Sequence, residues 1–201
     1  MRPPRADAER ACAAGARRLR ALVASGLLAI GACASTGVDD AADLLSLVAR
    51  ADYAALSARA CDRGALAFAP YARNLSRLHL SRLEAAELRR FASIDRLYEW
   101  GRYDGSGEPI RLTPLAYHQR FVWDIDYRTR ALPQRMGVDQ LRTDSDLAAV
   151  AQAFPGAEAI VYRYPGAERL DRKDARELIL VGRTRPQGWC LLALAHSEDT
   201  V

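Results

Sequence analysis

The sequence lacks the short motifs by which most catalytic and metal sites are recognised. Its three histidines, His79, His118 and His196, include no H-x-x-x-H pair, no serine lies in a nucleophile elbow, and no Walker phosphate-binding motif is present. The apolar run Ala21–Ala32 is too short to span a bilayer as a mature helix. These absences argue against the common zinc, serine-hydrolase and nucleotide-hydrolysing classes, and they predict neither a metal nor a cofactor.

The excess of positive charge is confined to one end of the chain. The formal net charge is +4, from 29 basic and 25 acidic residues. Residues 1–32 contain six arginines against only Asp7 and Glu9, so their removal leaves 23 basic and 23 acidic residues. A neutral remainder does not have the electrostatic character of a nucleic-acid-binding domain. We therefore predict no nucleic-acid partner.

Residues 1–32 resemble a bacterial lipoprotein signal peptide, in which an Arg-bearing stretch precedes a short apolar run. The run ends in Ile30, Gly31 and Ala32 before Cys33, which resembles the lipobox. This resemblance implies cleavage before Cys33, lipidation of that cysteine with acyl chains such as palmitate, and anchoring on the periplasmic side of a membrane. Ala34, in place of an aspartate, implies sorting to the outer membrane. The alternative is a buried N-terminal helix with a chance cysteine.

Two of the four cysteines remain once the signal peptide and the lipidation site are set aside. Cys12 lies within the signal peptide and Cys33 would carry the lipid, which leaves Cys61 and Cys190. In an oxidising compartment such a pair is a candidate disulfide. Cys190 also lies in an apolar, strand-like run, so two buried thiols are an equally good interpretation.

The chain divides into a signal peptide at 1–32, a small and polar flexible tether at 33–40, and a single α+β domain at 41–201. Because helical patterns cluster early and strands late, we predict N-terminal helices packed on a curved antiparallel sheet. An Arg-rich loop is expected at 128–137. The expected helices cover 41–60, 82–94, 114–125 and 146–154, and the expected strands cover 65–72, 96–103, 108–113, 158–165, 176–184 and 188–197.

The stretch Tyr103–Pro109, with the sequence YDGSGEP, combines acidic, glycine and hydroxyl residues as the start of an ion-binding or phosphate-binding loop does. It lacks the glycine and the bidentate glutamate of an EF-hand at the required spacing, and it lacks the lysine of a phosphate loop. Its glycines supply positive φ angles, which a tight connection between two strands needs. We therefore interpret it as a turn.

Asp124 and Asp126, in the stretch FVWDIDY, form a pair of neighbouring carboxylates. Paired carboxylates divide the roles of acid and base when their environments differ, so Asp104, His118, Asp124 and Asp126 together are a candidate catalytic site. The alternative is that Asp124 and Asp126 form ion pairs with nearby arginines. An assembled site of His196 with Glu198 is a further arrangement that the sequence leaves open.

Four stretches, WGRYDGSGEPIRLT, FVWDIDY, FPGAEAIVYRYPG and GWCLLALAHSE, resemble a family of uncharacterised bacterial extracytoplasmic proteins with a W-G-x-Y-D-G-S-G-x-P motif. The similarity covers the chain from about Ala41 onward, and it transfers no functional residues. Cys190 and Asp199 stand where that family has aromatic residues. The order of elements also resembles the cone of nuclear-transport-factor-like domains, an analogy that concerns the fold alone.

The leading functional hypothesis is a lipid-anchored, non-enzymatic module of the cell envelope that binds an envelope protein, a polymer or a small ligand. The alternative is a periplasmic hydrolase-like enzyme built on Asp104, His118, Asp124 and Asp126. Aromatic side chains supply large and rigid contact area, so those near the Asp104 loop are the candidate binding residues. With Asp104 they are Tyr98, Trp100, Tyr103 and Trp123.

Overall fold

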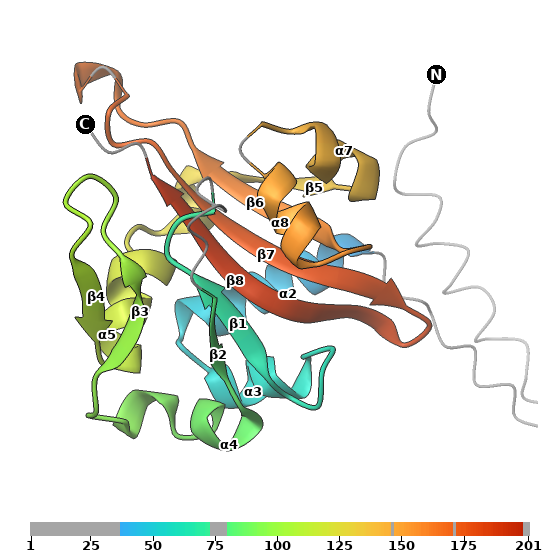
Figure 1. The fold of residues 1–201 in the computed structure, drawn as a ribbon. Helices are drawn as coiled ribbons and strands as arrows, with labels where there is room; N and C mark the ends of the chain where they lie inside the picture. The colour runs from blue at the N-terminus through green and yellow to red at the C-terminus, as the bar shows by residue number, and fades with distance from the viewer. Residues whose placement is uncertain (1–36, 73–79, 146, 171, 199–201) are drawn as a thin grey trace, which may run out of the picture. The chain divides into compact units, whose positions relative to one another are not determined.

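A computed structural model describes residues 37–72, 80–145, 147–170 and 172–198. These residues form both helices and strands, and the fold belongs to the α+β class (Figure 1). The predicted signal peptide, the lipidation site Cys33 and His79 lie outside the described residues. None of the described helices has the length and apolar character that a membrane crossing requires.

The main sheet has six strands in the order β2-β1-β8-β7-β6-β5. All neighbouring strands are antiparallel except β1 and β8, which run parallel with Phe68 opposite Leu194. The sheet is therefore mixed and not purely antiparallel. Most of the chain separates β1 from β8 in the sequence, so no hairpin turn forces these two strands to run antiparallel. The strands are β1 (Leu66–Ala69), β2 (Ser81–Leu83), β5 (Leu132–Met136), β6 (Glu158–Tyr164), β7 (Arg176–Arg185) and β8 (Gly188–Glu198).

A separate two-stranded hairpin of β3 (Tyr98–Arg102) and β4 (Pro109–Leu112) packs beside the sheet, where β3 neighbours β1 and β2. Short helices connect the strands. They are α2 (Gly37–Ala49), α3 (Tyr53–Ala58), α4 (Ala85–Leu88), η2 (Phe91–Ser93), α5 (Pro114–Tyr117), the π-helical η3 (His118–Val122), α6 (Tyr127–Arg130), α7 (Val138–Thr143), α8 (Ala148–Ala153) and η4 (Glu168–Leu170).

Alternation along the strands gives the sheet two buried faces with different packing. On β7, Leu178 and Leu180 belong to a large aromatic core, whereas Ile179 and Val181 belong to a core of small aliphatic residues. Helix α2 contributes to the aromatic core, and α7 and α8 cover the aliphatic one, so helices lie on opposite faces of the sheet (Figure 1). The aromatic core includes Tyr53, Phe68, Phe91, Trp100, Tyr117 and Phe121.

Three expected elements differ from the structure. Helix α2 begins at Gly37, so the last four residues of the expected tether are helical. The helix expected at 82–94, where Ser81 and Glu84 have the spacing of a capping box, is replaced by β2, α4 and η2. Ser81 instead donates a hydrogen bond to the Glu99 carbonyl in β3, and Glu84 and Glu87 cap α4. The expected Arg-rich loop at 128–137 contains α6 and the edge strand β5.

The stretch Tyr103–Pro109 connects β3 to β4, which confirms the turn interpretation. Gly105 and Gly107 have φ angles of 89° and 69°. A Cβ at either position would meet no atom within 4 Å, so the turn needs these glycines for their backbone conformation. The amide of Tyr103 donates to the Glu108 carbonyl at 2.8 Å and closes the loop.

Candidate functional site

A buried polar cluster lies on the aromatic face of the sheet, centred on Asp124 and His196. Strand β8 brings His196 to this face, where the residue is only 1% exposed. Its Nδ1 lies 3.2 Å from the Pro70 carbonyl, which can only accept, so this nitrogen carries a proton. Its Nε2 lies 3.4 Å from Asp124 Oδ2. This distance makes an electrostatic contact rather than a strong hydrogen bond, and no other described residue bonds to Nε2.

Asp124 receives two further donors. The Tyr127 hydroxyl donates to Oδ1 at 2.9 Å, and Arg176 Nη1 donates to Oδ2 at 2.6 Å. Burial by itself raises the pKa of the Asp124 carboxyl, but His196, Tyr127 and Arg176 together outweigh burial and lower that pKa to about 2. The carboxyl is therefore ionised at neutral pH and is a poor proton donor or acceptor there.

A second ion pair extends this cluster toward the surface. The Arg120 guanidinium donates from both terminal nitrogens to Glu198, at 2.8 and 3.1 Å, and its Cζ lies 4.6 Å from the centre of the Phe121 ring. Such a two-pronged pair fixes the geometry of both side chains. We call the six residues that share this site the Asp124 cluster: Arg120, Asp124, Tyr127, Arg176, His196 and Glu198.

The Asp124 cluster also has the composition of a metal site. One ligand atom each from Asp124, His196 and Glu198 lies within 4.8 Å of the others, and a metal-binding histidine commonly donates its second ring nitrogen to a carbonyl. However, Arg176 and Arg120 already hold both carboxylates. A cation here would face two guanidinium charges, so the arrangement fits an ion-pair network better than a metal centre.

The low pKa of Asp124 has a consequence for acid stability. A carboxyl whose pKa falls from 3.8 to about 2 on folding stabilises the protein above pH 3.8, and this contribution disappears as the pH falls toward 2. We expect a loss of about 2 kcal/mol over that interval. The variant Asp124→Asn should lack this drop in urea unfolding from pH 5 to pH 2, and it should already be destabilised at pH 7.

Asp126→Asn is the matched control for this experiment, because Asp126 forms a solvent-exposed ion pair with Arg128. Its hydrogen bond with Arg128 also lowers the pKa of Asp126, but solvent screens this exposed pair, so the acid-induced drop should stay close to that of the unsubstituted protein. An unchanged drop in Asp124→Asn would contradict the assignment of a stabilising role to the buried carboxylate.

The four residues of the candidate catalytic site bond to separate partners. His118 is buried, and its Nδ1 is hydrogen-bonded to the Tyr53 hydroxyl at 3.0 Å. Burial lowers the pKa of His118 to about 4. Asp126 caps helix α6 and pairs with Arg128, and Asp104 lies in the exposed β3–β4 turn. Only Asp124 of the four joins the polar cluster described above.

The candidate binding aromatics differ in exposure. Trp100 is fully buried, stacks on Tyr117 with ring centres 4.0 Å apart, and donates from Nε1 to the Leu112 carbonyl. It is a core residue and cannot be a contact residue without unfolding. Tyr98, Tyr103 and Trp123 pack against the core and remain partly exposed.

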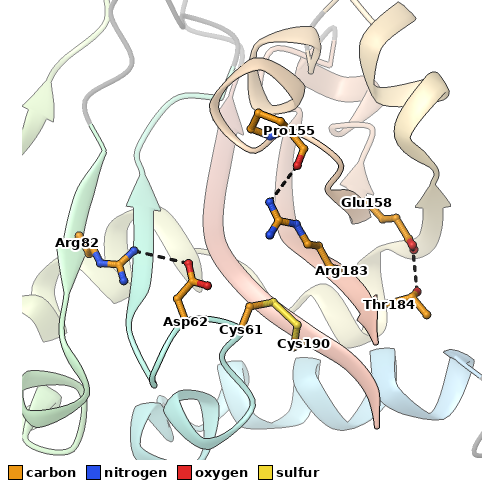
Figure 2. Close-up of a disulfide and its surroundings, with 8 residues drawn as sticks. All are labelled: Cys61, Asp62, Arg82, Pro155, Glu158, Arg183, Thr184 and Cys190. Carbon is orange, nitrogen blue, oxygen red and sulfur yellow. Dashed lines mark hydrogen bonds and ion pairs between the residues drawn. A yellow bond between two sulfur atoms is a disulfide. The ribbon is translucent and has the colours of Figure 1, made fainter. Parts of the chain in front are cut away.

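The structure joins Cys61 and Cys190 by a disulfide, with Cα atoms 5.0 Å apart (Figure 2). Cys61 lies between α3 and β1, and its amide donates to the Leu191 carbonyl at 2.8 Å. The bridge therefore ties the segment before β1 to the last strand of the sheet. Ion pairs and hydrogen bonds surround it, including Arg82 with Asp62 and Arg183 with the Pro155 carbonyl (Figure 2).

Sequence reasoning did not identify Arg120 and Arg176 as members of the cluster. Their partners Glu198 and Asp124 are 78 and 52 residues away in the sequence, so no spacing pattern connects them. The sequence signal for this site was in β8, where His196 directly follows a run of apolar residues near the end of the strand.

No family model, no curated protein and no solved structure matches the chain. Functional conclusions therefore rest on the residues and geometry described above.

Proposed function

We propose that the protein is an exported, lipid-anchored domain of the bacterial cell envelope that binds its ligand without transforming it. Acyl chains on Cys33 would hold it on the periplasmic side of the outer membrane. The observation that carries the proposal is the disulfide between Cys61 and Cys190. Disulfides persist in the periplasm and are rare in the cytosol, where thiols are kept reduced.

Binding is favoured over catalysis by the state of the buried ionisable groups. A general acid or base works best with a pKa near the working pH. The pKa of Asp124 is lowered to about 2 and that of His118 to about 4, so neither is poised for proton transfer at neutral pH. The alternative of a hydrolase that uses Asp104, His118, Asp124 and Asp126 gains no support from their separate bonding partners.

The partners that fit this proposal are an envelope protein, an envelope polymer or a small ligand. Among the aromatic residues that the sequence suggests, Tyr98, Tyr103 and Trp123 keep exposed surface. Tyr103 directly precedes the exposed turn that contains Asp104, so this end of the β3–β4 hairpin is the contact region that we propose for a macromolecular partner.

The test is the intact mass of the full chain after expression in a Gram-negative host and extraction from membranes, with alkylation before and after reduction. We expect a mass that begins at Cys33 and includes acyl chains. We also expect Cys61 and Cys190 to be alkylated only after reduction. The variant Cys33→Ser should lose the lipid and membrane retention, whereas the matched variant Cys12→Ser should behave as the unsubstituted protein.

An unlipidated, full-length product with free thiols would contradict the proposal. It would also return the six arginines of residues 1–32 to the mature protein. Cytosolic partners would then become the appropriate targets.

A further inference from the structure

A cavity of about 260 Å³ lies where β6 and β8 end and β7 begins. Its polar lining includes Arg163 of β6, Arg176 and Glu177 of β7 and Ser197 of β8, together with Asp144 and Ser145 from the segment between α7 and α8. Arg163 pairs with Glu177 and Arg176 pairs with Asp124, so each guanidinium charge in the lining has a carboxylate partner. Typical sites for drug-sized ligands occupy about 300–1,000 Å³, so this cavity suits a smaller molecule.

The register of the sheet explains why these polar side chains meet. Arg163 is opposite Glu177 across β6 and β7, and Glu177 is opposite Ser197 across β7 and β8. Their neighbours two residues away, such as Ile179 and Ala195, belong to the aliphatic core. Since side chains two apart in a strand share a face, the polar row continues directly from the edge of that core.

Two atoms in this row are buried without a hydrogen-bond partner among the described residues: Glu177 Oε2 and Ser197 Oγ. Glu177 is 4% exposed and Ser197 is 2% exposed. The other oxygen of Glu177, Oε1, accepts from Arg163 Nε. Burial of an unpaired carboxylate oxygen is costly, because water no longer solvates it, so this geometry calls for a donor inside the cavity.

The chemistry of the two atoms selects the kind of donor. A carboxylate oxygen only accepts hydrogen bonds and carries negative charge, while the serine hydroxyl accepts or donates. A primary ammonium group has three N–H donors and a positive charge, so it can serve both atoms at once. The remaining lining includes Tyr164, Pro165 and Ala175, whose apolar atoms suit the methylene groups of a short aliphatic amine.

We propose that this cavity binds the primary ammonium group of a small ligand, with Glu177 Oε2 and Ser197 Oγ as its hydrogen-bond acceptors. The proposal deepens the binding function proposed above and rests on it. Lipidation at Cys33 is measured by mass, and ligand binding in the cavity is measured by titration. The two experiments are independent, so a negative result in one does not change the interpretation of the other.

The test is an NMR titration of the full chain, purified in detergent and labelled with ¹⁵N, with 1,4-diaminobutane as the probe. The matched neutral probe is 1,4-butanediol, which has the same chain length. We expect saturable shifts of the Glu177 and Ser197 amide resonances with the diamine. The diol should bind about tenfold more weakly or worse, because it has no positive charge to pair with the Glu177 carboxylate.

Variants separate this site from nonspecific attraction. Glu177→Gln keeps the shape of the side chain but removes its charge, and it should reduce diamine affinity about tenfold while reducing diol affinity by a smaller factor. Ser197→Ala should weaken diamine binding by a smaller factor, and it provides a second test if Glu177→Gln does not fold. The control Glu99→Gln makes the same chemical change on an exposed strand of the β3–β4 hairpin and should leave the affinity unchanged.

Three outcomes would overturn the proposal. The first is the absence of a saturable response to millimolar diamine, in which case water alone solvates the two buried atoms. The second is equal affinity for diamine and diol, or equal diamine affinity in Glu177→Gln. The third is a stronger response to Ca²⁺ than to the diamine, which would assign these oxygens to a metal ion.

Discussion

Replacing Cys61 and Cys190 by alanine together should lower the free energy of unfolding by about 5 kcal/mol. The two cysteines are 129 residues apart, so the bridge closes a loop that spans most of the described chain. Loop-closure entropy grows with the logarithm of loop length, and the unfolded state loses more freedom here than it would with a local bridge. Urea unfolding of both proteins without reductant measures the difference.

Reductant provides the control for this prediction. It should destabilise the unsubstituted protein toward the level of the double variant and should leave the double variant unchanged. A difference in unfolding free energy below about 1 kcal/mol would mean that the bridge constrains the unfolded chain far less than its loop length implies.

Acidification from pH 6.5 to pH 4 should remove about 3 kcal/mol of stability through His118 alone. Burial lowers the pKa of this imidazole from 6.5 to about 4 in the folded protein. The unfolded chain therefore binds a proton between these pH values that the folded chain does not bind. Stability from this source is complete above pH 6.5 and is lost as the pH falls toward 4.

The variant His118→Asn isolates this effect. Its side-chain amide offers both a donor and an acceptor, so it can replace Nδ1 as the hydrogen-bond partner of the Tyr53 hydroxyl, but the amide does not titrate. Between pH 6.5 and pH 4, the unfolding free energy of this variant should fall by about 3 kcal/mol less than that of the unsubstituted protein. Asp124→Asn is a useful comparison, because the stability that the Asp124 carboxyl contributes is lost only below pH 3.8. This variant should therefore keep the His118-dependent change between pH 6.5 and pH 4. An unchanged pH dependence in His118→Asn would rule out the buried imidazole as the source.

Local sequence patterns determined the elements whose stability depends mainly on neighbouring residues. The strands β6, β7 and β8 are confirmed almost to their ends, because each is a long apolar run and β7 and β8 are joined by a short hairpin turn. The start of α5 is also confirmed, since Thr113 accepts from the Ala116 amide and Pro114 occupies the first helical position.

Tertiary structure decided the elements and contacts that no local pattern encodes. Strand β5 is mostly exposed and contains Pro133, so only its pairing with β6 makes it a strand. The parallel pairing of β1 with β8 and the burial of Trp100 likewise depend on segments far apart in the chain.

The same distinction applies to the sites. The sequence by itself determined that Cys61 and Cys190 were a candidate pair and that the Asp104 stretch was a turn. Only the folded chain placed Asp124 beside His196 and aligned Glu177 with Ser197 across two strands. The physical reason is that a buried polar group is assigned its partner by the packing around it, and the strands and loops that supply those partners are separated by many residues in the sequence.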